Sequence, residues 1–303
     1  MIRPARPRPG DRIGLIAPAG PVDDAGRATA VAQVQALGFV PVLASNAAER
    51  RGYLAGTDAA RARGVSELLN DPTVRGFIAL RGGYGTQRIL GSVQWGPIVR
   101  DPRPVVGYSD LTALHAALWR LGVISLHGPM AALPWSVATQ AALRRALTDP
   151  GPMGPVPWPP GTRPRTLRGG RARGRLAGGN LTTVAAMRGS GWAHDLEGTV
   201  LLLEEVGEAP YAIDRLLWQL RDCGALAGVR AVILGEWVRC SGDDPEPVDP
   251  SRVVLEALGR EIPVLGDLPV GHGQEILTLP LGVEVEVDAD RGSVTVLEPH
   301  LRP

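Results

Sequence analysis

Short apolar runs alternate with helix-like segments through the first half of this chain, and this alternation restricts the fold more than any other feature. Turn residues bound each run, and the runs span residues 13–17, 39–43, 76–80, 104–106 and 123–126. Between them, apolar residues recur at helical spacing in residues 27–37, 58–69 and 111–121. Apolar strands separated by helices indicate a parallel sheet with helices on both faces. We therefore expect an α/β fold.

The second half has a more mixed pattern and follows a stretch rich in Pro, Gly and Arg, a composition typical of a linker. A chain of 303 residues also exceeds the length at which a single core keeps growing. Alternation with period two at residues 283–287 and 293–297 predicts a hairpin near the end. We expect a first domain over residues 1–150, a junction loop over 151–170 and a second domain over 171–303.

The charge balance argues against two classes of partner. The chain has 32 basic and 31 acidic residues, giving a net charge of +1, and every basic residue is an arginine. We therefore expect neither a nucleic acid nor a membrane surface as a partner. No stretch reaches the roughly 18 apolar residues of a membrane span. The apolar run at residues 13–19 is too short for a signal peptide, so we expect a cytoplasmic protein.

The sequence offers no recognisable set of metal ligands. It contains no H-E-x-x-H, H-x-H or paired aspartate motif. Its two cysteines, Cys223 and Cys240, do not form a C-x-x-C pair. We expect neither a metal nor another cofactor.

A serine stands where one apolar run should turn into a helix. The sequence at residues 105–112 reads V-V-G-Y-S-D-L-T. Such a turn would lift the Ser109 hydroxyl clear of the backbone, and the helix N-terminus behind it suits a developing oxyanion. Serine is also a preferred helix N-cap, and G-x-S-D lacks the second glycine of the hydrolase motif. The residues alone therefore leave Ser109 as either a nucleophile or a helix cap.

A glycine-rich loop, R-G-G-Y-G at residues 81–85, follows the apolar run at 76–80. Glycines at the end of a strand let the backbone approach a ligand and point N–H groups at it. The spacing G-G-x-G is a weak match to phosphate-binding motifs. The same loop could donate hydrogen bonds to an oxyanion beside Ser109, because neighbouring strand ends share one crevice in doubly wound folds. It could also be a simple tight turn.

A nucleophilic serine needs a base, and the chain has five histidines. His272 lies between two glycines at the end of an extended run, which would expose its imidazole on a loop. His115 and His127 have apolar neighbours and are expected in the core. We expect His194 in a surface turn and His300 at a frayed C-terminus.

A histidine base in turn needs a carboxylate that fixes its tautomer. Glu204 directly follows an expected strand over residues 199–203, where its side chain can project into a crevice. Glu205 would point to the opposite face, and Glu208 would be solvated. Taken singly, each of these acids is also consistent with a surface or capping role.

These pieces resemble the L,D-carboxypeptidases of the serine peptidase class, a family that includes muramoyltetrapeptide carboxypeptidases and microcin C self-immunity proteins. Each motif is weak, but their order along the chain is specific. The matching segments are G-L-I-A-P-A-G at 14–20, R-G-G-Y-G at 81–85, V-G-Y-S-D at 106–110, H-G-P-M at 127–130, G-G-N-L at 178–181, L-E-E-V-G-E at 203–208 and G-H-G at 271–273.

The resemblance implies a catalytic triad of Ser109, Glu204 and His272. It also implies an oxyanion hole made by the backbone N–H groups of Gly83 and Asp110, with Gly82 as an alternative to Gly83. The fold implied is a Rossmann-like, flavodoxin-like first domain that carries the serine, and a smaller mixed β/α second domain that carries the other two residues. Members of the family are typically homodimers, so a homodimer is expected.

The function implied is release of the C-terminal D-alanine from murein tetrapeptides during peptidoglycan recycling, through an acyl-enzyme. Arg81, Gly82 and Tyr84 are the expected substrate contacts. A first alternative is hydrolysis of peptidyl or aminoacyl nucleotides, as in the self-immunity branch, whose members carry a longer aromatic insertion near the domain junction. A second alternative is a non-catalytic nucleotide- or sugar-binding α/β protein with residues 81–85 as its phosphate loop.

Overall fold

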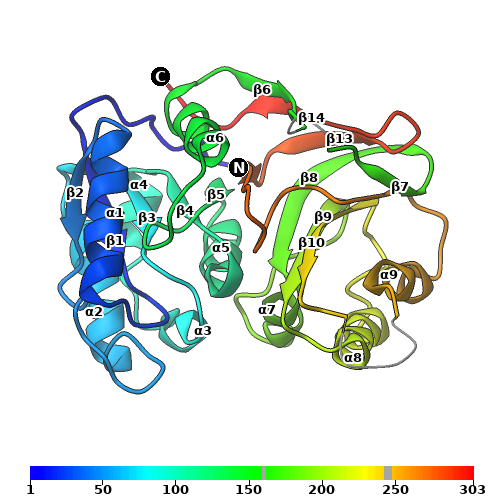
Figure 1. Ribbon diagram of the computed structural model, residues 1–303, viewed down its shortest axis with the longest axis horizontal. Helices are drawn as coiled ribbons and strands as arrows, with labels where there is room; N and C mark the ends of the chain where they lie inside the picture. Colours follow the sequence, from blue (N-terminus) through cyan, green and yellow to red (C-terminus); the bar gives the residue numbers. More distant parts are fainter. Residues whose placement is uncertain (159–161, 242–247) are drawn as a thin grey trace.

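The computed structural model describes residues 1–158, 162–241 and 248–303, which form two β-sheets with helices packed against them (Figure 1). The first sheet has the strand order β12-β5-β4-β3-β1-β2. Strands β1 to β5 run parallel to one another, and β12 pairs with β5 in the antiparallel direction. These strands are β1 (Arg12–Ile16), β2 (Val40–Leu43), β3 (Val74–Ala79), β4 (Val105–Gly107), β5 (Ser125–His127) and β12 (Leu279–Leu281).

Without β12, the order of the first sheet is 2-1-3-4-5, which is the flavodoxin-like arrangement. Helices α1 and α6 contribute buried side chains to one face of this sheet, and α2 to α5 contribute to the other. The expected fold class of the first half is thereby confirmed. The helices are α1 (Asp24–Ala36), α2 (Asp58–Asn70), α3 (Thr86–Ile89), α4 (Gly96–Arg100), α5 (Thr112–Arg120) and α6 (Val137–Thr148).

Several helices begin at a side chain that accepts a hydrogen bond from the backbone of the first turn. Asp23 accepts from the Gly26 N–H at the start of α1, and Thr57 does the same for Ala60 at the start of α2. Such caps satisfy N–H groups that have no partner inside the helix. The sequence thus marks where the helices start, and therefore where the strand-to-helix loops that line the site must end.

The second sheet has eight strands in the order β6-β14-β13-β8-β9-β10-β11-β7. Its centre, β8 to β11, is parallel, and its flanks are antiparallel, as the mixed pattern of the second half predicted. The strands β13 and β14 form the expected hairpin. The strands are β6 (Pro152–Pro155), β7 (Arg165–Arg168), β8 (Arg171–Asn180), β9 (Thr199–Val206), β10 (Ala231–Val238), β11 (Val264–Gly266), β13 (Glu284–Asp288) and β14 (Ser293–Pro299).

Three helices pack against one face of this second sheet, and their buried residues form a separate cluster with β9 and β10. They are α7 (Leu181–Ala186), α8 (Pro210–Asp222) and α9 (Pro250–Leu258). Among the described residues, none of the helices is both long and apolar enough to cross a membrane.

Three strand pairings differ from the expected division of the chain. The segment expected as a junction loop, residues 151–170, contributes β6 and β7 to opposite edges of the second sheet. Conversely, β12 comes from the second half and extends the first sheet beside β5. Strand edges that would otherwise expose unpaired backbone groups are covered by these distant segments. The two sheets are therefore linked by more than one connection.

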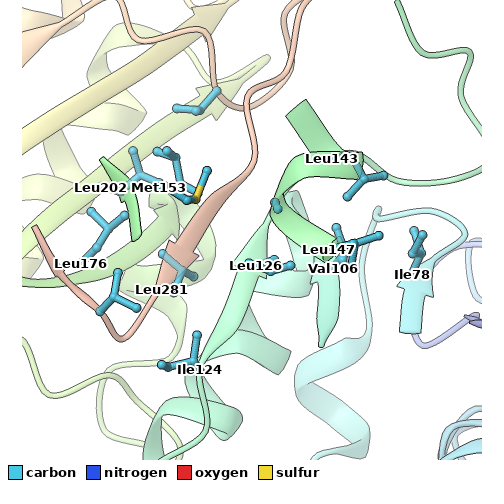
Figure 2. Packing of buried hydrophobic residues seen from close by; sticks show 14 of the residues in the cluster. Ile78, Val106, Ile124, Leu126, Leu143, Leu147, Met153, Leu176, Leu202 and Leu281 are labelled. Atoms are coloured by element: carbon cyan, nitrogen blue, oxygen red, sulfur yellow. The ribbon is translucent and has the colours of Figure 1, made fainter. Parts of the chain in front are cut away.

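A single hydrophobic cluster joins the two sheets (Figure 2). Leu126 of β5 and Leu281 of β12 pack in the same cluster as Leu176 of β8 and Leu202 of β9. Because protein interiors are closely packed, a shared core holds its elements in fixed relative positions. Groups carried by the first sheet and by the second can therefore be held together in one site.

Candidate active site

Ser109 lies in a sharp turn between β4 and α5. Its backbone φ is +61°, a left-handed value that is uncommon outside glycine, and a single 3-10 turn at Ser109–Leu111 leads into the helix. Residues held in such sparsely populated conformations cost about 1–3 kcal/mol each and cluster at functional sites. The neighbouring imidazole of His115 contacts the Gly107 carbonyl oxygen through Nε2 at 2.8 Å, which braces the end of β4.

The glycine-rich loop packs directly over this serine. A Cβ built on Gly82 would lie 3.0 Å from the Ser109 Cβ and 3.2 Å from its Oγ, so a larger residue would press on the hydroxyl. Gly83 has a φ of +110°, which favours glycine. The Gly82 carbonyl accepts a hydrogen bond of 2.9 Å from the Gly20 N–H. The backbone of the loop is thereby held against the serine turn.

Asp110 links the serine turn to the same loop through its side chain. Its Oδ2 accepts a hydrogen bond of 2.8 Å from the Thr86 N–H, at the start of α3. Burial raises the pKa of this carboxyl, while its hydrogen bonds to Thr86 act in the opposite direction. The fully buried Arg61 donates to the Gly85 carbonyl at 2.7 Å and fixes the other side of the loop. No sequence pattern indicated this role for Arg61, because one arginine in an amphipathic helix resembles any other.

His272 and Glu204 form a direct pair. The His272 Nδ1 lies 2.7 Å from the Glu204 Oε2, and the Glu204 side chain is fully buried. Burial raises the pKa of Glu204, and the bond to His272 lowers it. The pair depends on a glycine, because a Cβ on Gly271 would stand 2.5 Å from Glu204 Oε2. Since Nδ1 faces the carboxylate, Nε2 is the ring nitrogen left for substrate chemistry.

Tyr108 fixes the plane of the imidazole. Its ring meets the His272 ring edge-on, with centroids 4.8 Å apart and an angle of 73° between the planes. Such edge-to-face contacts contribute about 0.5–1.5 kcal/mol beyond burial. Burial and the nearby Glu204 carboxylate raise the pKa of Tyr108 well above its usual value, so the phenol stays neutral.

One cleft of about 490 Å³ brings together the residues that the sequence placed far apart. Ser109, His272, Arg81, Gly82 and Gly83 all line it. Among the described residues, Ser109 and His272 face this common space without a hydrogen bond between them. Apo sites often show long or misaligned contacts of this kind that tighten when substrate binds.

A second hollow, of about 230 Å³, lies on another side of Ser109. Asp110, Gly83 and Tyr84 line it together with Glu205 and Glu208. Glu205 points away from Glu204, as the strand alternation predicted, and accepts hydrogen bonds of 2.8 Å from the Asn180 side chain and from the Thr182 N–H. Glu205 therefore holds the start of α7, whereas Glu208 is half-buried at the rim, less solvated than expected.

Three further residues near the site were not predicted from the sequence. Arg50 and Arg239 are exposed and line the main cleft with Arg81. These three arginines outnumber Asp23, the one acidic residue among the described residues of its lining, so the rim carries a net positive charge. Glu236 of β10 lies against the loop that carries His272, since a Cβ on Gly273 would overlap its carboxylate. Burial raises the pKa of Glu236. No motif surrounds these residues, so only the fold brings them to the site.

Two of the other histidines do not lie where they were expected. His194 is 2% exposed and meets Trp119 edge-on with ring centroids 5.8 Å apart, so the expected surface position is wrong. His300 is also buried and its Nε2 lies 2.7 Å from the Ala146 carbonyl oxygen, because the C-terminal segment packs against α6 instead of fraying. His115 and His127 are in the core as predicted. Burial lowers the pKa of His115 to about 4, and lowers those of His127 and His194 to about 3.

Within the described part of the chain, no group of three or more His, Cys, Asp or Glu side chains is placed to hold a metal ion. The chemistry that the described groups offer is instead nucleophilic. A strained serine shares a cleft with an imidazole that a buried carboxylate orients, which is the general pattern of serine hydrolases.

Comparison with known proteins agrees with this geometry. The family model for the LD-carboxypeptidase N-terminal domain matches residues 13–128, and that for the LD-carboxypeptidase C-terminal domain matches residues 173–287. The chain therefore belongs to the LD-carboxypeptidase family, and it is a carboxypeptidase. The resemblance stated from the sequence is confirmed, as is the two-domain α/β architecture.

Individual relatives span nearly the whole chain. A Streptomyces coelicolor protein, whose carboxypeptidase name is provisional, is 39% identical over 99% of this chain and 98% of its own. The murein tetrapeptide carboxypeptidase of Pseudomonas aeruginosa is 31% identical and covers 92% of this chain and 94% of its own.

Among solved structures, the microcin C7 self-immunity protein MccF in an inactive mutant apo state superimposes with a TM-score of 0.91 at 26% identity, over 100% of both chains. The muramoyltetrapeptide carboxypeptidase of Oxalobacter formigenes does so with a TM-score of 0.81 at 29% identity, over 95% of this chain and 99% of its own. The relatives thus include both substrate branches that the sequence left open.

Proposed function

We propose that this protein is an L,D-carboxypeptidase that releases the C-terminal D-alanine of murein tetrapeptides in peptidoglycan recycling. The observation that carries the proposal is the 2.7 Å contact between His272 Nδ1 and buried Glu204, in a cleft that Ser109 also lines. The names of the Pseudomonas and Oxalobacter relatives support the substrate class.

In the proposed mechanism, His272 Nε2 takes the proton from Ser109 Oγ as the oxygen attacks the carbonyl carbon before the terminal residue. The N–H groups of Gly83 and Asp110 hold the resulting oxyanion, and one such donor is worth roughly 3 kcal/mol. Collapse of the tetrahedral intermediate breaks the C–N bond, and the imidazolium gives its proton to the leaving amine. Water activated by His272 then hydrolyses the ester on Ser109. Glu204 keeps the Nδ1–H tautomer throughout.

The cationic rim of the cleft supports a substrate that carries carboxylates. Arg81 is the arginine nearest in sequence to the oxyanion loop, and its Nη1 donates to the Pro21 carbonyl at 3.1 Å, which leaves the rest of its guanidinium fork for a ligand. Guanidinium groups bind carboxylates with two parallel hydrogen bonds. We assign Arg81 to a substrate carboxylate, with Gly82 and Tyr84 as neighbouring contacts.

The second candidate is hydrolysis of a peptidyl or aminoacyl nucleotide, which the likeness to MccF supports. One observation favours the murein peptide. Trp158, the aromatic residue of the 151–170 segment within the described chain, packs against the main hydrophobic core and does not line the cleft. Trp158 is therefore not placed to stack on the nucleotide base of such a substrate.

Parallel turnover assays separate the two substrates. We expect D-alanine release from a murein tetrapeptide with a kcat/KM at least about 100-fold above that for an aminoacyl nucleotide analogue. A tetrapeptide ending in L-alanine serves as the control for stereochemistry, and it should be cleaved far more slowly. Faster turnover of the nucleotide, or equal cleavage of both alanine epimers, would contradict the proposal.

We further propose that the protein acts in the cytoplasm as a homodimer. The support for a cytoplasmic location is the recycling function itself, and the support for a dimer is the family resemblance. Light scattering on the purified protein should give twice the 32.0 kDa mass of one chain. A monomeric mass at micromolar concentration would reject the dimer.

A further inference from the structure

A hollow of about 520 Å³ lies beside the oxyanion loop, and one of its lining residues, Tyr53, has no role in the chemistry described so far. We call it the tyrosine hollow, and its walls include Tyr53, Tyr84, Arg50, Arg81 and Gly83. Arg50, Arg81 and Gly83 also line the main cleft, so the two spaces adjoin at the loop that packs over Ser109. A ligand that leaves the cleft past Arg81 enters the tyrosine hollow.

The two tyrosines are exposed although they form a pair. Tyr53 is 65% exposed and Tyr84 is 50% exposed, while their ring centroids lie 5.9 Å apart with 58° between the planes. Large aromatic side chains left in water are costly, and clusters of them on a surface mark binding sites. Tyrosine also offers a hydroxyl that can hydrogen-bond a polar ligand while its ring contacts an apolar face.

The turn that carries Tyr53 is rigidly anchored. Arg51 and Leu54 exchange two backbone hydrogen bonds, of 2.8 and 3.1 Å, around the Gly52-Tyr53 tip. The buried Asn46 side chain donates to the Ala55 carbonyl at 2.8 Å, and Ala55 N–H donates to the Ala19 carbonyl at 2.9 Å. The turn is thereby tied to the loop after β1.

Tyr84 is held equally firmly, because the oxyanion loop is fixed at Gly82, Gly85 and Thr86 by the bonds described above. The backbone that carries both rings is therefore fixed without a ligand. A site whose backbone is formed in advance loses less conformational entropy when it binds.

The angle between the two tyrosine rings and the positive charge of the neighbouring arginines indicate which class of ligand the tyrosine hollow binds. Two rings inclined by 58° do not offer the parallel faces that sandwich a planar base, and the hollow of about 520 Å³ that they line has room for a puckered ring. The guanidinium groups of Arg50 and Arg81 add donors for hydroxyl, carbonyl and anionic oxygens. These are the features of a site for a polyhydroxylated ring.

We propose that the tyrosine hollow is a substrate subsite that binds the sugar ring of a glycan-bearing murein peptide. This inference rests on the proposed function, because a carboxypeptidase removes only one residue and the remainder of its substrate must lie on the acyl side of Ser109. Three extended residues span about 10 Å. The main cleft, which Ser109 lines, shares Arg50, Arg81 and Gly83 with the tyrosine hollow, so this remainder can extend from the serine into the hollow.

The test compares a murein tetrapeptide with the same peptide carrying an N-acetylmuramoyl group at its N-terminus. For the wild type, we expect kcat/KM for D-alanine release to be about three- to ten-fold higher with the sugar, mainly through KM, which corresponds to one aromatic contact. In Tyr53→Ala that ratio should fall to about one. Tyr211→Ala is the matched control, since Tyr211 is 69% exposed, contacts Arg215 and lines none of the hollows described.

Three outcomes would overturn the subsite. They are equal kcat/KM values for the two peptides in the wild type, a sugar preference that survives in Tyr53→Ala, and a benzoyl group that replaces the sugar with the same gain. The ratio within each variant cancels any general loss of active protein. It therefore reports on the ring contact alone.

If neither peptide is cleaved, the proposed function fails while the subsite is still tested. Saturation-transfer NMR with N-acetylmuramoyl-L-alanine then measures binding directly on the wild type and on Tyr53→Ala. Signal from the sugar protons that disappears in the variant supports the subsite. Absence of that signal from the wild type, or equal signal from both proteins, rejects it.

Discussion

Replacing Gly271 with alanine should separate the His272 imidazole from the Glu204 carboxylate. Gly271 has a φ of +107°, and the added methyl would stand 2.5 Å from Glu204 Oε2. Ordinary contact begins at 3.4 Å, so the carboxylate must withdraw by about 0.9 Å. A misplacement of about 1 Å at a catalytic group costs on the order of 100-fold in rate. The left-handed backbone adds about 1–2 kcal/mol of destabilisation.

The assay measures kcat and KM for D-alanine release together with the urea midpoint of unfolding. Gly189→Ala is the control, because its φ is +85° and an added methyl would meet nothing within 4 Å. We expect both variants to lose stability through the left-handed backbone, and Gly271→Ala to lose more because of the clash with Glu204, but only Gly271→Ala to lose about 100-fold in kcat. A folded Gly271→Ala enzyme with the kcat of the wild type would refute the reasoning, as would equal kcat losses in the two variants.

Three other measurements test separate parts of the structure. Gly82→Ala should lower kcat/KM by about ten-fold or more, since its Cβ would lie 3.0 Å from the Ser109 Cβ, and unchanged kinetics would reject that packing. Arg81→Ala should raise KM by at least about ten-fold with little change in kcat, because a charge-assisted hydrogen bond is worth 1.5–3 kcal/mol, and an unchanged KM would remove Arg81 from the substrate contacts. His194 stays neutral when folded, because burial lowers its pKa to about 3, whereas the unfolded chain takes up a proton below about pH 6.5. Stability from this group is therefore lost as pH falls, and the wild type should lose about 2 kcal/mol more than His194→Gln between pH 7 and pH 5 in urea titrations, with equal losses contradicting the buried neutral state.

Local sequence patterns were sufficient for the parts of the fold that depend on local chemistry. The apolar runs of β1 and β3 and the helix signals around α1 and α5 gave the parallel sheet and the position of the serine turn. Pairings between distant segments were not predictable in this way. Strand β12 joins β5 across more than 150 residues, and nothing within residues 279–281 indicates which edge they complete.

The residues of the candidate site also fall into those with a local sequence pattern and those that only the fold brings together. The motifs around Ser109 and His272 could be found because glycines next to a reactive side chain leave a pattern in sequence. Arg50 and Arg239 could not be found, since an exposed arginine has no local signature until the fold brings it to a cleft. The burial of His194 was missed because its glycine-rich neighbourhood resembles a surface turn, and nothing in that neighbourhood indicates that the distant Trp119 packs against the imidazole.

Asp110 illustrates how one residue can hold two parts of a site. Its backbone N–H is the proposed oxyanion donor, and its side chain fixes the start of α3 through Thr86. The sequence pointed to the backbone role alone, through the family motif. The structure adds that the carboxylate sets the distance between the serine turn and the glycine-rich loop, so both proposed oxyanion donors depend on it.

The central claim is that Ser109 is the nucleophile of a carboxypeptidase acting on murein tetrapeptides. The most direct test is D-alanine release from a murein tetrapeptide by wild type and by Ser109→Ala, each confirmed as folded by its unfolding midpoint. We expect the wild type to release D-alanine stoichiometrically and the variant to be slower by at least about 1,000-fold. Release by Ser109→Ala at the rate of the wild type would contradict the account.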